Sequence, residues 1–367
     1  MDIPFDILNI IASYIVKPKI RLLDWIKESK LDIPILARNP NSISILENNR
    51  WMLGKYFRGY LSENPNAIDL LEEFPHAINW EIASGNPNAY RLWEANLDKI
   101  HWDVLSGNPN AINLLENNID KIYWDDLSGN PNAIKILEDN QDKINWSELS
   151  GNPNAIKLLE NNIDKIDWDM LSRNPNAIEL LEQNIDKINW HNLSGNPNAV
   201  HIIEANLSNI MDKIDWIMLS SNPNAIHILE NHIDKISWMF INLNPNGCRL
   251  MEADLDKINW EWLSRNPNAI HILEKNLDKI EWKELSTNPN AIHLLKANQD
   301  KICWKFLSSN TNIFEPDIKY NNTKLLKKVS ELDKFINNYS KLSCIKDTCH
   351  SIQSYTKSNI NNSCVLL

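Results

Sequence analysis

The sequence predicts an all-α fold, an α-solenoid of about twelve helix–turn–helix repeats with helical caps. Three observations lead to this prediction. The triplet Asn-Pro-Asn occurs twelve times, and from Pro65 onward the step between copies is 22 residues, apart from one step of 26 between Pro197 and Pro223. Isoleucine, leucine and tryptophan return at fixed places between the copies. A thirteenth copy, Asn310-Thr311-Asn312, has lost its proline, so we place the array at residues 39–312.

Each unit is expected to hold two short helices. In the unit that begins at Asn152, this asparagine is the predicted N-cap and Pro153 the first helical residue. Asn161 and Asn162 would end the first helix in the left-handed conformation, as would the glycine that often precedes the triplet. Asp167 or Asp169 can cap the second helix. The alternative, isolated β-turns at Asn-Pro-Asn-Ala, does not account for the periodic apolar residues between the copies.

Tryptophan fills one position in eleven units. An exposed row of indole rings could stack on bases or sugars. Each ring, however, follows an isoleucine by two residues and usually precedes a leucine by three, which favours core packing. We therefore predict core tryptophans, among them Trp102, Trp124, Trp146, Trp168 and Trp190. The Asp-Lys-Ile triplets before them are interpreted as solvated surface pairs that contribute little stability.

Residues 1–38 precede the array and carry helical apolar spacing at Ile7, Leu8, Ile11 and Tyr14. One interpretation is an N-terminal helical cap over the open end of the solenoid. The other is that the segment resembles the start of an F-box, which binds an Skp1-like adaptor of ubiquitin ligases. That resemblance covers about 15 residues, and only a loose match continues over Lys19–Ile26. The residues that it implies for adaptor binding are Ile3, Pro4, Ile7, Leu8, Ile11 and Tyr14.

The fifth position of each unit, counted from its proline, faces away from the apolar stripe and is mostly basic or titratable. Exposed positions of a repeat tolerate many residue types, so the basic composition of this position can be a coincidence. The functional interpretation is a partner-binding ridge for an acidic segment, strengthened as histidine becomes protonated. The residues of this candidate ridge are His201, His227, Arg249, His271 and His293.

The longer step of 26 residues inserts Ser208–Met211, which we place in a loop. Beyond it, apolar residues replace polar ones at the start of the second helix. An added loop beside added apolar side chains predicts either a contact patch or local repacking, and the sequence leaves both open. The apolar residues are Ile217, Met218, Met239, Phe240 and Trp262.

The C-terminal part divides at residue 342. Residues 313–342 contain a predicted capping helix over Thr323–Lys341, and residues 343–367 read as a flexible tail. The tail ends in Cys364-Val365-Leu366-Leu367, a CaaX-like box that predicts prenylation of Cys364 and hence possible membrane association. An unmodified apolar end is the alternative.

Composition excludes several classes of protein. The 367 residues carry a formal net charge of -11, which argues against a nucleic-acid binder. Five cysteines have no disulfide or zinc spacing, and we expect no metal and no cofactor. The recurring carboxylates are too uniform to single out an acid–base pair, so we expect no enzymatic activity. The N-terminus lacks a secretory signal and no segment is long and apolar enough to span a membrane, so we expect a cytoplasmic protein.

The 22-residue unit, Asn-Pro-Asn-Ala-Ile followed by Asp-Lys-Ile and Trp, resembles the repeat proteins of giant DNA viruses. Their arrays often follow F-box-like segments. The resemblance implies a protein-protein interaction scaffold in the host cell cytoplasm, an F-box-type substrate adaptor that recruits targets to a host ubiquitin ligase. The alternative is a structural or virion-associated scaffold with no ubiquitin link. The sequence leaves the oligomeric state and the bound protein open.

Overall fold

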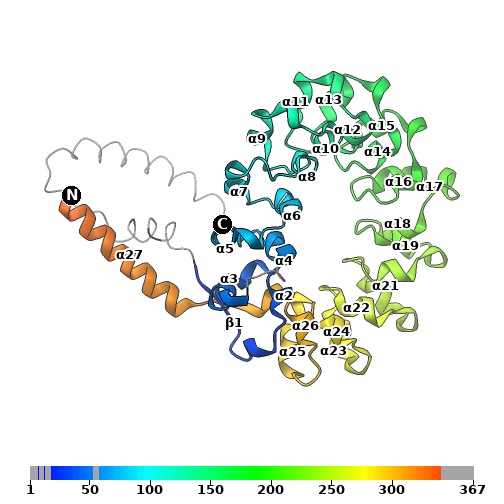
Figure 1. Cartoon of the computed structure of the whole chain (residues 1–367). Helices are drawn as coiled ribbons and strands as arrows, with labels where there is room; N and C mark the ends of the chain where they lie inside the picture. Colours follow the sequence, from blue (N-terminus) through cyan, green and yellow to red (C-terminus); the bar gives the residue numbers. More distant parts are fainter. Residues whose placement is uncertain (1–6, 8–11, 13–17, 53–57, 340–367) are drawn as a thin grey trace. The chain divides into compact units, whose positions relative to one another are not determined.

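The computed structural model describes residues 7, 12, 18–52 and 58–339. The chain forms two compact units, Asp24–Ile313 and the combination of Met1–Leu23 with Phe314–Leu367. The predicted all-α solenoid is confirmed in the first of these units, the array, where successive helices contact one another in series (Figure 1).

Each repeat begins with a turn, as the unit at Asn152 illustrates. The Ala155 N–H donates to the Asn152 carbonyl (3.2 Å), and the Asn154 N–H donates to Asn152 Oδ1 (3.0 Å). The first helix then starts at Ile156, three residues later than predicted. Asn152 is therefore the acceptor of a turn that leads into the helix, and Pro153 lies in that turn, outside the helix.

The first helix ends by a side-chain bond. Asn162 Nδ2 donates to the Leu158 carbonyl (3.0 Å), which satisfies one of the orphan acceptors of the helix. The predicted left-handed cap is wrong, because no residue in the described part of the chain has a positive φ. A 3₁₀ turn, Ile163–Lys165, follows as a third element that the sequence did not predict. Asp167 caps the second helix, as expected, by accepting the N–H groups of Asp169 and Met170.

The two helices of each unit form two series. Figure 1 shows the first helices as an outer row and the second helices as an inner row. The first-helix series is α3 (Ile43–Asn48), α5 (Ile68–Glu73), α7 (Tyr90–Ala95), α9 (Ile112–Glu116), α11 (Ile134–Asp139), α13 (Ile156–Glu160), α15 (Ile178–Glu182), α17 (Val200–Ile210), α19 (Ile226–Glu230), α21 (Cys248–Ala253), α23 (Ile270–Lys275) and α25 (Ile292–Ala297). The second-helix series is α2 (Ile33–Leu36), α4 (Arg58–Glu63), α6 (Trp80–Gly85), α8 (Trp102–Ser106), α10 (Trp124–Gly129), α12 (Trp146–Gly151), α14 (Trp168–Arg173), α16 (Trp190–Leu193), α18 (Trp216–Ser221), α20 (Trp238–Ile241), α22 (Trp260–Arg265), α24 (Trp282–Leu285) and α26 (Trp304–Leu307).

Short 3₁₀ turns join the helices. Most lie between the first and second helix of a unit, at Glu28–Lys30, Arg50–Met52, Pro75–Ala77, Ile119–Lys121, Gln141–Lys143, Ile163–Lys165, Ile185–Lys187, Ile233–Lys235, Leu255–Lys257 and Leu277–Lys279. Three others fall on the Asn-Pro-Asn segment or its variant, at Pro40–Ser42, Pro289–Ala291 and Thr311–Ile313.

The inserted residues Ser208–Met211 do not form the expected loop. They lengthen α17 to 11 residues, and Ile210 at its end is buried. Four residues are close to one helical turn of 3.6, so the apolar face of the helix continues without changing direction.

The core of the array repeats with the sequence. In the unit at Asn152, Ala155, Leu158, Leu159, Ile166 and Leu171 are buried, and their equivalents are buried in other units. Neither helix would be stable alone, since each is far shorter than the roughly 12–15 residues that an isolated helix needs. Stability therefore comes from contacts between units.

A row of buried asparagines joins the units. Asn174 Nδ2 donates to the carbonyls of Ser150 (3.0 Å) and Asn152 (2.9 Å) of the preceding unit. The same arrangement, with one or both bonds, occurs at every first asparagine of the repeat in the described residues. These thirteen residues, which we call the asparagine ladder, are Asn39, Asn64, Asn86, Asn108, Asn130, Asn152, Asn174, Asn196, Asn222, Asn244, Asn266, Asn288 and Asn310.

The asparagine ladder closes on itself. Asn39 Nδ2, in the first unit, donates to the carbonyls of Ser308 (3.4 Å) and Asn310 (3.0 Å), in the last. Asn41 likewise bonds the carbonyl of Thr311 (3.1 Å). The N–H of Asp32 donates to Ser308 Oγ (2.8 Å), the bond that Asp167 makes to Ser150 inside the array. Each contact has an equivalent between consecutive units, so the array is a closed series of thirteen turns.

Closure changes two expectations from the sequence. The array begins at Asp24 rather than at residue 39, because Leu31, Asp32 and Leu36 occupy the places of Ile, the helix cap and Leu in a repeat. This half-unit lacks the Asn-Pro-Asn-Ala-Ile start, which is why the repeat count missed it. The ladder also leaves no open end for a cap to cover, since Asn39 completes it.

The second compact unit contains two strands and a long helix. Strand β1 (Ile20–Leu22) pairs antiparallel with β2 (Phe314–Pro316), with Arg21 opposite Glu315. The predicted C-terminal helix is present as α27 (Ile318–Tyr339). Ala12, which is helical, and Val329 of α27 are buried in one apolar cluster with Leu325 and Leu332. The loose F-box match over Lys19–Ile26 thus falls partly on a strand and not on a helix.

Replacing one ladder residue should destabilise the protein far more than replacing the exposed asparagine beside it. Asn174→Ala removes two buried hydrogen bonds to backbone carbonyls and should lower the free energy of unfolding by about 2–4 kcal/mol. Asn176→Ala removes one exposed bond to the Pro153 carbonyl and should cost less than about 1 kcal/mol. Urea unfolding followed by circular dichroism compares them. Equal losses would contradict the role assigned to the ladder.

Candidate functional site

No catalytic or metal centre emerges from the described residues. They contain no group of three or more His, Cys, Asp or Glu side chains that could hold a metal ion. Cys248 and Cys303 are free thiols, and burial, followed by the nearby Glu252, raises the pKa of Cys248. A raised pKa keeps the thiol protonated, which makes this cysteine a poor nucleophile.

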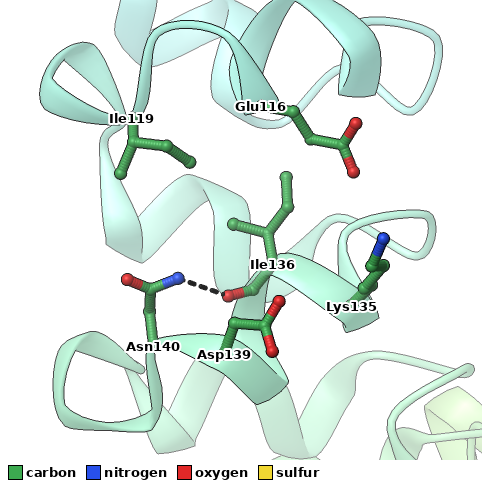
Figure 2. A pocket seen from close by; sticks show the side chains of 6 residues that line it. All are labelled: Glu116, Ile119, Lys135, Ile136, Asp139 and Asn140. Atoms are coloured by element: carbon green, nitrogen blue, oxygen red, sulfur yellow. Dashed lines mark hydrogen bonds between the residues drawn. The ribbon is translucent and has the colours of Figure 1, made fainter.

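The one pocket that we describe lies between two consecutive units and has a volume of about 200 Å³. This is below the roughly 300–1,000 Å³ of small-molecule sites. Figure 2 shows its mixed lining, in which the only bond drawn runs from Asn140 Nδ2 to the Ile136 carbonyl (2.9 Å). The six lining residues are Glu116, Ile119, Lys135, Ile136, Asp139 and Asn140. The pocket is a gap between repeats and converges on no reacting group.

Most of the candidate adaptor-binding residues lie outside the described part of the chain. These residues are Ile3, Pro4, Leu8, Ile11 and Tyr14. Ile7 is described, and it is helical and half-buried. Cys364 and the expected flexible tail over residues 343–367 also lie outside the described residues.

The candidate ridge is exposed, but each of its side chains already lies beside a glutamate within the array. His201 Nε2 lies 2.9 Å from Glu182 Oε1, and His293 Nε2 lies 2.7 Å from Glu274 Oε1. Arg249 Nε lies 3.2 Å from Glu230 Oε1. His227 and His271 lie in the same way beside Glu204 and Glu252. Each of these five side chains thus meets a glutamate of the preceding unit, which weakens the case for an acidic partner here.

The tryptophan row is half-buried and does not belong to the fully buried core. Trp102, Trp124, Trp146, Trp168 and Trp190 are each partly exposed. In eight of the described units a lysine of the following unit covers the ring, with Nζ 4.4–5.3 Å from its centroid. The lysines of the Asp-Lys-Ile triplets are therefore inter-unit contacts and not only solvated charges. Lys30 over Trp304 adds a further contact where the array closes.

A serine in the second helix, which the sequence did not lead us to single out, forms hydrogen bonds that join consecutive units. Ser150 Oγ donates to the Trp146 carbonyl (2.7 Å) and accepts the N–H of Asp167 (3.0 Å) in the next unit. Its recurrence after leucine in nearly every unit was the available signal. Asn242 stands where a serine is expected, and its buried Oδ1 has no hydrogen-bond partner among the described residues.

At the start of the second helices, the first and second positions after tryptophan change in chemical type along the array, and neighbouring units tend to carry the same type. We call this surface the second-helix face. Its early units carry acidic residues, namely Asp103, Asp125, Asp126, Glu148 and Asp169. Its later units carry apolar residues, and Lys283 and Lys305 follow. Since the buried rows stay constant, this variation is not required by the repeat packing.

The acidic block has no ion pair to a described cation, in contrast to the glutamates of the ridge. Partial burial first, and then the carboxylate of Asp103, raise the pKa of Asp126, and Asp125 adds to the effect. The pKa of Asp167 is instead lowered, because the Ser147 hydroxyl and two backbone N–H groups stabilise its carboxylate. Asp126 thus lies in a partly buried environment with two neighbouring carboxylates.

Apolar side chains gather on three consecutive second helices, α18, α20 and α22. Ile217 is 50% exposed, Met239 51% and Leu243 42%. Met218, Phe240 and Trp262 lie beside them and are half-buried. We call these six residues the apolar cluster. Three of them are exposed by two-fifths or more, so folding of the chain leaves much of the cluster uncovered.

No protein-family model, curated protein or solved structure matches the chain. No helix among the described residues is long and apolar enough to cross a membrane.

The two aspartates should titrate on opposite sides of the ordinary aspartate pKa, which is about 3.9. We expect Asp126 above it and Asp167 below it in carboxyl-carbon NMR titrations. Asp103→Asn should lower the pKa of Asp126, and Ser147→Ala should raise that of Asp167. If Asp126 titrated at or below Asp167, the described electrostatics of the second-helix face would be wrong.

Proposed function

We propose that the protein is a non-enzymatic protein-binding scaffold. The observation that carries this proposal is the apolar cluster, where Ile217, Met239 and Leu243 are exposed at positions that hold polar, charged or small residues in most other units. Exposed apolar groups gain stability when a partner covers them, at about 25 cal/mol per Å² removed from water. Repeat arrays commonly bind partners through such extended rows of side chains.

A finer form of the proposal makes the chain a substrate adaptor of a ubiquitin ligase. The N-terminal segment would bind an Skp1-like protein through Ile7 and its neighbours, and the array would bind the substrate. The strand at Ile20–Leu22 restricts this adaptor-binding region to the first part of the F-box-like segment. Prenylation of Cys364 would add attachment to a membrane.

The alternative is a structural or virion-associated scaffold with no ubiquitin link. The closed asparagine ladder favours it, because an array bonded at both ends resists bending and local fraying more than an open one. Both forms predict protein partners, and they differ in whether an Skp1-like protein is among them.

Cross-linked purification of the tagged full-length chain from eukaryotic cells tests the proposal. We expect partners that are lost in the double variant Ile217→Glu/Met239→Glu. The adaptor form further predicts an Skp1–cullin complex that Ile7→Ala/Leu8→Ala removes while the array partners remain. Absence of Skp1 with retained array partners would leave the structural scaffold. Absence of any partner sensitive to the cluster variant would contradict binding through this surface.

A further inference from the structure

The apolar cluster is continuous across units because of how the repeat places its side chains. Between consecutive units, the residue before Asn-Pro-Asn faces the second residue after the next tryptophan. Gly195 and Met218 illustrate this, since a Cβ on Gly195 would lie 3.5 Å from Met218 Sδ. Arg265 and Glu284, which form an ion pair, occupy the same two positions. Leu243 and Trp262 occupy them as well, which joins the apolar side chains of the units of α20 and α22. Between α18 and α20 the same positions hold Ser221 and Phe240, and the two helices contact each other.

The unit that contains α20 departs from the repeat in its packing. Asn242 replaces the serine, and its Oδ1 is buried without a hydrogen bond among the described residues. Gly247 replaces the usual alanine, and a Cβ there would approach the Ile241 carbonyl oxygen to 2.7 Å. A buried polar atom without a partner costs stability. These changes do not improve the core, and they occur where the exposed apolar side chains Met239 and Leu243 lie.

Charge near the cluster restricts what can cover it. Glu261 lies beside Trp262 in the last unit of the cluster, and Asp169, at the near end of the acidic block, lies two units before Ile217. Lys283, in the unit that follows the cluster, lies 3.4 Å from Glu284. Neither Glu261 nor the acidic block has an ion pair to a described cation, whereas the ridge glutamates are paired with His or Arg. The chain as a whole carries a net charge of -11. A nucleic acid, an anionic membrane or a second copy of this chain would bring like charge to this surface.

From these observations, and resting on the proposed scaffold function, we infer that the apolar cluster binds a cationic amphipathic segment of a partner protein. The apolar side chains of the segment cover Ile217, Met239 and Leu243, and its lysines or arginines contact Glu261 and Asp169, the end of the acidic block nearest to the cluster. Neighbouring helices lie about 10 Å apart, so a helix of about 27 residues, roughly 40 Å long, spans the four steps from α22 to α14, which carries Asp169.

The inference is tested with two synthetic peptides and the full-length protein. One peptide of about 27 residues carries leucine on one helical face and lysine on the other, and the second carries glutamate in place of lysine. Fluorescence anisotropy should show binding of the leucine–lysine peptide and at least about 10-fold weaker binding of the leucine–glutamate peptide. Binding of the lysine peptide should weaken as salt is raised.

Matched variants locate the binding site. Met239→Glu should weaken binding of the lysine peptide by about 10-fold or more, because it places a charge in the apolar contact. Ile163→Glu changes an aliphatic side chain of similar exposure, 43%, outside the second-helix face and should leave binding unchanged. Asp169→Asn should weaken binding and reduce its salt dependence, while Asp164→Asn, on a 3₁₀ turn of the same unit, should not. Circular dichroism confirms that each variant is folded.

Three results would overturn the inference: equal binding of both peptides, equal loss in Ile163→Glu and Met239→Glu, or no loss in Met239→Glu. Cellular partners that depend on Ile217 and Met239 would in that case still support the scaffold function with a partner of other chemistry. Peptide binding that depends on Met239, without any cellular partner, would support the inferred surface chemistry and count against the scaffold function.

Discussion

The structure depends on a pair of hydrogen bonds from one asparagine amide to two carbonyls of the preceding unit. In the case of Asn174 both bonds are buried, and one of the two acceptors, the Asn152 carbonyl, also accepts the Ala155 N–H in the turn that begins the repeat. Because one side chain satisfies two carbonyls of its neighbour, each unit completes the one before it. This explains how helices of about six residues can form a stable fold, since the units supply one another with packing and polar partners.

The same bond explains why the array can close. A solenoid normally ends in units whose outer faces differ, because the last repeat has no neighbour. Here Asn39 supplies the donor that the unit of Asn310 requires, and Asp32, Asn41 and Lys30 repeat three further inter-unit contacts. With the ends joined, every ladder carbonyl lies between neighbours. The residues left to interact with other molecules are those on the surface rows.

Much of the fold could be predicted from the sequence because the buried positions repeat with it. The isoleucines and leucines that return at fixed places include the buried Leu158, Ile166 and Leu171, and the helical pairs followed from this spacing. The start of the first helix was misplaced because Asn152 looks like an N-cap, and only the structure shows that its turn ends before Ile156. Closure could not be predicted, since Leu31–Asn39 preserve only half of the repeat and their partners lie about 270 residues away.

The surfaces were harder to predict than the core. Composition identified the basic character of His201 and Arg249, but not the glutamates of the preceding unit that pair with them. The tryptophans looked like core residues because isoleucine and leucine flank them, whereas the rings are partly exposed and most lie under a lysine of the next unit, as Trp146 does under Lys165. The apolar substitutions after the insertion were visible in the sequence. Their exposure depended on the register between units, which only the structure provides.

A distance measurement across the join tests closure most directly. Arg38, Thr287, Ser221 and Arg265 occupy the same position in their units, directly before Asn-Pro-Asn or its equivalent. In a variant without native cysteines, spin labels at Arg38 and Thr287 would be two units apart across the join, and labels at Ser221 and Arg265 two units apart within the array. Double electron–electron resonance should give matching distributions near about 20 Å plus the label length. A longer or much broader distribution for the pair across the join would contradict the closed array.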